Sequence, residues 1–527
     1  MIARLCMGLV VVVSFVSTWS CKPNACDVAQ GRLSCTKESI AYADYSKKEL
    51  VNADFSKVEG QFVNFEQANL SGADFFQGDC TRGNFKHAML DGSNLTALIA
   101  PDAQFNQASL NSATLLAAVL KNSSFQRVVA KRADFTSASL EGAQFLGADL
   151  TESSFKRSDL SNANFNESNL SSVDFSGSDL SGAIFDNATV NKIRLNGAKI
   201  SPTTRWPDKV SLVWRIVNEE YTDDDLYAIS SKEKPVDLSA VYLKGANLAQ
   251  KTLKSANFSA SSVVESKLGL SDLTQAEFAK AYVENSDFTS ASMFATSFNQ
   301  AEIRNSDFSS ADANKISFND ALIDGINFKS AMLDNAQFIK ARIKKGQFDH
   351  ASLTNADFFG AIMPSSSFME ADLVGTQFSN TDVRGANFQG ARFEQKTSFE
   401  KANASGANLS ALDLKNIKFN GGIFIDANFT NSDLRKTNFT SANLRNAHLK
   451  SVKLQEANFT NADLRNANLS GALLSTANLT DANLKGAQIS MDTQLDSARF
   501  KNTTCPNGEL STDKDGCSGK LNIKVGR

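Results

Sequence analysis

Histidines, cysteines and carboxylates are the residues of this chain that could carry out chemistry, and their spacing argues against catalysis. The 527 residues include only three histidines, His87, His350 and His448, which lie far apart in the sequence. No serine, cysteine or carboxylate accompanies them at the spacing of a catalytic triad or a metal site. The 57 acidic residues are spread along the whole chain. We therefore predict a protein that is not an enzyme, with no catalytic residue, no cofactor and no metal ion.

The element that must position any other site is a repeat of five residues. A bulky apolar residue recurs at every fifth position, with a small residue two before it, as in Ala462-Asp463-Leu464. A period of five fits neither a helix nor a flat strand. We expect the bulky and the small residue to point inward and the other three to face water. Bulky residues of one kind recur at intervals of twenty, which indicates four sides to a coil. The predicted core ladder consists of Phe288, Phe308, Phe328, Phe348, Phe368 and Phe388.

This pattern resembles that of the pentapeptide-repeat family over roughly residues 38–502. The resemblance implies an all-β solenoid, a right-handed quadrilateral β-helix whose coils stack and whose ends need caps. We expect two such modules joined by a short helical insert. Register slips near 394–399 and 490–495 are interpreted as bulges. The predicted organisation is a signal peptide at 1–20, a cysteine-containing segment at 21–37, β-helices at 38–200 and 238–502 with the insert at 201–237 between them, and a cysteine-containing tail at 503–527.

The insert at 201–237 breaks the five-residue period. Apolar residues from Val210 to Val217 follow the spacing of an amphipathic helix, and Thr222 with the acids after it indicates a second helix start. One interpretation is a structural cap that closes one β-helix and joins the next. The other is a surface for a partner, with Trp206 and Trp214 as its contacts.

The N-terminus resembles an export signal. Arg4 precedes a largely apolar run of residues 5–16, which is too short to span a bilayer. Cys21 follows Ser20, which makes it a candidate for lipidation, although the residues before it match the lipoprotein motif poorly. Simple secretion is the alternative. We expect the protein in the periplasm, attached to the outer membrane or outside the cell, with a lipid as its only link to a membrane.

Five of the seven cysteines lie at the two ends of the repeat, as expected for an exported solenoid with disulfides at its ends. Cys505 and Cys517 enclose a short polar loop similar to tails of exported pentapeptide-repeat proteins, and Cys26 with Cys35 is the matching pair at the N-terminus. Zinc binding is the competing explanation, but no histidine lies near either pair.

Charge separates two hypotheses for function. Some pentapeptide-repeat proteins mimic DNA and occupy the DNA-binding site of a type II topoisomerase. Duplex DNA carries one negative charge per ~1.7 Å of its axis, so a mimic about 100 Å long needs about 60 negative charges. This chain has 57 acidic and 54 basic residues, a net charge of −3. We therefore favour an exported structural or protein-binding scaffold of the bacterial cell envelope or exterior, with a DNA mimic as the alternative. The expected partner is an unidentified protein or envelope component, and nucleic acid is not expected. Formation of a homodimer is a further possibility.

Overall fold

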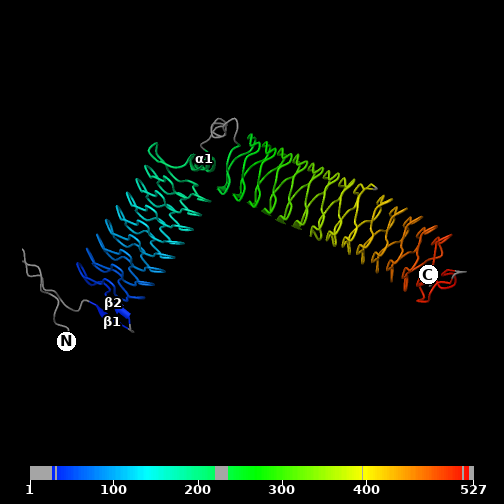
Figure 1. The fold of residues 1–527 in the computed structure, drawn as a ribbon, viewed down its shortest axis with the longest axis horizontal. Helices are drawn as coiled ribbons and strands as arrows, with labels where there is room; N and C mark the ends of the chain where they lie inside the picture. Colours follow the sequence, from blue (N-terminus) through cyan, green and yellow to red (C-terminus); the bar gives the residue numbers. More distant parts are fainter. Residues whose placement is uncertain (1–25, 30–31, 220–234, 395, 513–515, 522–527) are drawn as a thin grey trace, which may run out of the picture. The chain divides into compact units, whose positions relative to one another are not determined.

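The computed structural model describes residues 26–29, 32–219, 235–394, 396–512 and 516–521 (Figure 1). The chain forms two compact units, one of residues 1–154 with 158–165 and one of residues 155–157 with 166–527. The named elements are β1 (Asp27–Ala29), β2 (Arg32–Ser34), α1 (Asp208–Val217), β3 (Tyr242–Lys244), β4 (Ser262–Val264), β5 (Tyr282–Glu284), β6 (Glu302–Arg304), β7 (Leu322–Asp324) and β8 (Arg342–Lys344).

Within each unit the backbone winds into coils that hydrogen-bond to the next coil in parallel. Residues twenty apart face each other, such as Asn64 and Asn84 in the first unit and Gln337 and Asp357 in the second. The Asn64 carbonyl accepts a bond of 2.7 Å from the N–H of Tyr45, and the Asn84 N–H donates to Val63. Each coil therefore satisfies the backbone of its neighbours, and the predicted all-β solenoid is confirmed.

Tight turns form the corners of the coils. At one corner the N–H of Ala341 donates to the carbonyl of Phe338 at 3.1 Å, and Lys340 between them has φ 57°. A positive φ is unfavourable for most residues and easiest for glycine, so glycines such as Gly360, with φ 68°, often occupy this position. The five-residue unit thus consists of a short extended side followed by one left-handed corner.

The core consists of stacked columns of the bulky residues. Every phenylalanine of the predicted ladder is fully shielded from solvent. Phe348 stacks on Phe368 with ring centroids 4.9 Å apart and an interplanar angle of 6°. A second phenylalanine column meets the first edge to face, as Phe358 meets Phe368 at 6.0 Å. Small residues such as Ala341 fill the remaining inward positions. The buried rings leave only the outward positions available for function.

Coils with one extra residue account for the slips in the repeat. Gln377 pairs with Ser398 and Leu473 with Gln494, at separations of 21 residues where 20 is usual. The phenylalanine column continues across the first slip, because Phe378 stacks on Phe399 at 4.8 Å. The extra residue therefore changes the sequence register but not the register of the core.

Antiparallel segments are found beside the outermost coils. At the N-terminus β1 pairs antiparallel with β2, and the Leu33 carbonyl then accepts the N–H of Asp54 in the first parallel rung. At the C-terminus Thr504 pairs antiparallel with Leu510, and Thr512 with Gly516. The last described backbone at both ends thus runs back on itself.

A candidate ligand-binding groove on strands β5 to β8

One side of the second unit is flatter than the others, because its rungs lengthen into three-residue strands. Strands β3 to β8 form a parallel sheet in sequence order, with Ile303 beside Ile323 and Ile323 beside Ile343. The corners after β3, β4 and β5 differ from the usual turn. The N–H of Ser266 donates to Oγ of Ser286, and that of Ser286 to Oγ of Ser306, each at 3.2 Å. A hydroxyl group from the next coil thus replaces the usual carbonyl acceptor of the turn.

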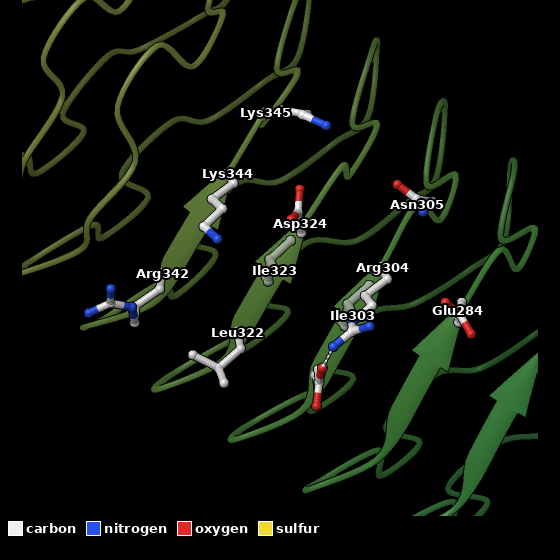
Figure 2. Close-up of a pocket in the computed structure, with 11 residues that line it drawn as sticks. Glu284, Ile303, Arg304, Asn305, Leu322, Ile323, Asp324, Arg342, Lys344 and Lys345 are labelled. Carbon is white, nitrogen blue, oxygen red and sulfur yellow. Dashed lines mark hydrogen bonds and ion pairs between the residues drawn. The ribbon is translucent and has the colours of Figure 1, made fainter.

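The alternation of a strand determines which side chains form the outer surface here. Ile303, Ile323 and Ile343 are buried, so the residue before and the residue after each of them face outward. A groove of about 650 Å³ lies along this outer face (Figure 2). We call it the β5–β8 groove; its lining consists of Glu284, Glu302, Ile303, Arg304, Asn305, Leu322, Ile323, Asp324, Arg342, Lys344 and Lys345.

Charges near β5 and β6 are paired within the protein. Arg304 bonds to Glu302 at 2.5 Å, and its guanidinium lies 5.6 Å from the ring centre of Tyr282. The hydrogen bond to Glu302, together with the attraction of its charge, raises the pKa of Arg304. Burial raises the pKa of Tyr282, as does its hydrogen bond to Glu284. Arg304 and Glu302 neutralise each other, and Glu284 adds one negative charge, so this end of the groove has no excess of positive charge.

Charges near β8 are not paired in this way. Arg342 and Lys344 project outward from β8, and Lys345 follows at the corner (Figure 2). Among the described residues, no carboxylate lies within ion-pairing distance of these three cations. All three side chains are exposed. This end of the groove therefore has a local excess of positive charge.

Asp324 is the carboxylate between the paired and the unpaired charges. In the sheet register it lies beside Arg304 on one strand and Lys344 on the other. Its Oδ1 atom is shielded from solvent and has no hydrogen-bond partner in the described structure. A shielded carboxylate oxygen without a donor is rare in folded proteins, and it makes Asp324 the least satisfied polar group of the groove.

A glycine keeps the corner of the groove open. Gly325 has φ 75°, and a Cβ atom there would lie 2.6 Å from Oδ1 of Asn305. The coils on either side carry Asn305 and Lys345 at the same corner. With only a hydrogen atom at Gly325, the space between those two side chains is left free.

The cysteines expected at the ends form disulfides. Cys26 is bonded to Cys35 and Cys505 to Cys517. Cys80 is a free thiol inside the core, and burial raises its pKa, so it stays protonated and unreactive. Cys21, the lipidation candidate, lies outside the described residues.

The prediction of Trp214 as a partner contact is wrong. Trp214 lies on α1, is only 8% exposed, and donates from Nε1 to the carbonyl of Ala198 at 2.7 Å. Its role is to fasten α1 to the coil that precedes it. Trp206 is half-buried, 5.8 Å from the ring of Phe185, and stays a candidate. The second helix start expected at Thr222 lies outside the described residues.

The histidines occupy separate outward positions. His87, His350 and His448 are all exposed, and His350 contacts only Glu370 among carboxylates, at 3.3 Å. No three His, Cys, Asp or Glu side chains converge to hold a metal ion within the part of the chain that the structure describes. None of the described helices has the length and apolar character needed to cross a membrane.

Comparison with known proteins identifies the class. Profiles described as "Pentapeptide repeat region" and "Pentapeptide repeats (8 copies)" match the chain in alternating stretches. The first matches residues 99–175 and 422–505, and the second matches 49–77, 61–96, 163–201, 237–275, 271–309 and 347–394. The chain belongs to the pentapeptide-repeat family, whose coiled structure is that of a scaffold.

Solved structures of other pentapeptide-repeat proteins are also similar. HetL from Nostoc sp. strain PCC 7120, involved in heterocyst differentiation regulation, is 20% identical over 48% of this chain and 91% of its own, with a TM-score of 0.19. A protein of the Arabidopsis thaliana thylakoid lumen is 30% identical over 23% and 85%, with a TM-score of 0.20. QnrB1, a plasmid-mediated fluoroquinolone resistance protein, is 18% identical over 36% and 85%, with a TM-score of 0.20. No curated protein sequence matches the chain.

The groove is the candidate site that the sequence analysis missed. Its signal is a run of serines at the small inward position on one side of the coil, at Ser266, Ser286 and Ser306. Elsewhere that position is mostly alanine. These serines follow β4, β5 and β6, whereas Ala246, Ile326 and Gly346 take the same position after β3, β7 and β8, so the signal covers only part of the sheet.

Proposed function

We propose that this protein is a non-enzymatic scaffold, exported to the bacterial cell envelope or exterior, that holds a ligand in the β5–β8 groove. The observation that carries the proposal is the pair of disulfides, one beside each end of the repeat. Disulfides persist in oxidising compartments and are rare in the reducing cytosol. The export-like segment before Cys21 supports the same location.

Cell fractionation with mass spectrometry of the mature N-terminus tests this proposal. We expect the chain outside the cytosol, cleaved before or near Cys21, with Cys26–Cys35 and Cys505–Cys517 oxidised. A lipid on Cys21 would add a fixed mass to the N-terminal peptide and place the protein at a membrane. Full-length chain with reduced cysteines in the cytosol would contradict the proposal.

A DNA mimic directed at a topoisomerase is the alternative function, and it requires a continuous acidic face. The groove side has Arg342, Lys344 and Lys345 without acidic partners, and farther along the same side Asp382 and Asp463 are neutralised by Arg384 and Arg465. These cations argue against mimicry on this side. The supercoiling activity of a purified type II topoisomerase should be unchanged by the protein, and strong inhibition would favour the mimic.

A further inference from the structure

We infer that the β5–β8 groove is a binding site for an acidic saccharide, that is, a sugar bearing a carboxylate and neighbouring hydroxyl groups. The inference deepens the proposed scaffold function, because an exported protein would meet such sugars. Four features of the sheet point to such a ligand: unpaired cations, the carboxylate of Asp324, an exposed apolar side chain and a backbone whose hydrogen bonds are already satisfied.

The cations define the charge of the ligand. Arg342, Lys344 and Lys345 lie on β8 and its corner without an ion-pair partner in the described structure. Like charges held close together repel, and an anion between them removes that repulsion. Hydrogen bonds from lysine or arginine to a carboxylate are among the stronger ones in proteins. An anionic group is therefore the expected occupant of the β8 end.

The carboxylate of Asp324 defines the groups next to that anion. Asp324 lies on β7, beside β8, and is half-buried; its Oδ1 is shielded, and its other oxygen, Oδ2, has no hydrogen-bond or ion-pair partner in the described structure. An anion without hydroxyl groups, such as sulfate, would be repelled by this carboxylate and could not donate a hydrogen bond to it. A sugar hydroxyl can donate to Asp324 while the carboxylate of the same ring contacts Lys344. The amide of Asn305 provides a further polar contact across the open corner at Gly325.

An exposed leucine supplies the apolar part of the site. Leu322 is 50% exposed and lies in register with Arg342 on the next strand. One face of a pyranose ring consists mainly of C–H groups, which pack on an aliphatic side chain. The volume of about 650 Å³ lies within the range of small-molecule sites.

The backbone of the sheet disfavours a peptide. A peptide that binds an exposed sheet usually adds as a strand and bonds to a free edge. Here β7 is paired with β6 on one side and with β8 on the other, and Ile343 of β8 donates to Ile362 of the following coil at 2.7 Å. The strands of the groove therefore have their backbone groups satisfied. Recognition must come from side chains, as is usual for sugars.

Calorimetric titration of the oxidised, purified protein with tetragalacturonate tests the inference. We expect saturable binding, and weaker or no binding of maltotetraose, inorganic phosphate and a hexaglutamate peptide. Lys345→Ala and Arg342→Ala should each weaken binding roughly tenfold, as expected for loss of a charge-assisted hydrogen bond. Lys340→Ala is the matched control, because Lys340 has the same corner position, with φ 57° against 53° for Lys345, on the adjacent side. It should bind as the unmodified protein does.

Asp324→Ala separates a sugar site from a general anion site. We expect it to weaken tetragalacturonate binding while leaving phosphate binding equal or stronger, with an unchanged melting temperature. No binding of tetragalacturonate, equal binding of phosphate or hexaglutamate, or insensitivity to both Lys345→Ala and Arg342→Ala would each overturn the inference. A cytosolic location with normal saccharide binding would instead contradict only the proposed export.

Discussion

Two adjacent sides of one coil obey the same five-residue rule and yet differ in structure. On the side of Phe288, the corner closes with a backbone bond of 3.1 Å from Ala291 to the Phe288 carbonyl. On the side of Val283, the N–H at the equivalent position, that of Ser286, bonds to the Ser306 hydroxyl of the next coil. The first side is a single bridge residue with a phenylalanine core, and the second is strand β5 with an aliphatic core.

The difference shows that the acceptor of one corner N–H separates the two sides of this coil. On the side of Phe288 the turn bonds to itself and the side stays a single bridge. On the side of Val283 the bond passes to a hydroxyl group of the next coil, and two outward residues of β5 lie on a flat surface. Strands β7 and β8 are equally long with Ile326 and Gly346 at this position, so the hydroxyl group accompanies the long strand only in part of the sheet. The groove lies on this second kind of side, whereas the aromatic sides supply most of the buried area.

The largest effect should come from breaking the aromatic side. Phe328→Asp places a carboxylate without a partner inside a fully buried column, which we expect to cost about 4 kcal/mol or more of unfolding free energy. Thermal unfolding followed by circular dichroism measures it as a lowered Tm. Lys329→Asp, on the neighbouring exposed residue, is the control and should change Tm little. Equal Tm values for both variants would refute the inward placement of Phe328.

Truncation at equivalent positions should sharpen the contrast between the two cores. Phe288→Ala removes a stacked ring and should cost about 3–5 kcal/mol, whereas Val283→Ala removes two methyl groups and should cost about 2 kcal/mol. Urea unfolding of the two variants compares them directly. A larger loss for Val283→Ala would mean that the strand side, and not the aromatic side, dominates stability.

Removing one hydroxyl group should weaken the corner after β4, where the N–H of Ser266 donates to Oγ of Ser286. Ser286→Ala deprives the Ser266 N–H of its acceptor, and an unsatisfied buried donor costs about 1–3 kcal/mol. Faster amide hydrogen exchange at Ser266 is the direct readout, with Ser309→Ala on an outward position as control. Unaltered exchange and stability in Ser286→Ala would show that the hydroxyl does not hold the corner.

The smallest effect concerns a charge pair on the groove side but outside the groove. Burial alone would raise the pKa of Asp463, but hydrogen bonds from Arg465 outweigh it and the net pKa is lowered. A carboxyl group whose pKa is lower in the folded than in the unfolded chain stabilises the fold at pH values above its ordinary pKa of about 4. That contribution is lost as the pH falls through the pKa of the folded state. Because both side chains are partly exposed, Asp463→Asn should cost below about 1 kcal/mol near pH 7 and about nothing near pH 2. A pH-independent difference in Tm would contradict this assignment.

The five-residue period was sufficient to predict the coil and its core, because burial leaves little choice for residues such as Phe348 or Ala341. The groove could not be predicted in the same way. Arg465 pairs with Asp463 two residues before it, whereas the position two before Lys344 is Arg342, so this difference is visible in the sequence. That Lys344 also forms no ion pair with Asp324, its neighbour in register twenty residues earlier, is visible only in the folded sheet. Trp214 was misjudged because its indole N–H donates to the carbonyl of Ala198, and this acceptor is brought next to α1 only by the folded coil.

The antiparallel turns at both ends have a consequence for assembly. A parallel rung presents free backbone groups on which another molecule could continue the spiral without limit, in the manner of a growing fibre. Pairing of β1 with β2 at one end, and of Thr504 with Leu510 at the other, reverses the direction of the backbone where such growth would begin. The disulfides Cys26–Cys35 and Cys505–Cys517 lock those reversals in place. The number of coils is thereby limited to what the gene encodes, and a structure built from an endlessly repeatable unit is kept finite.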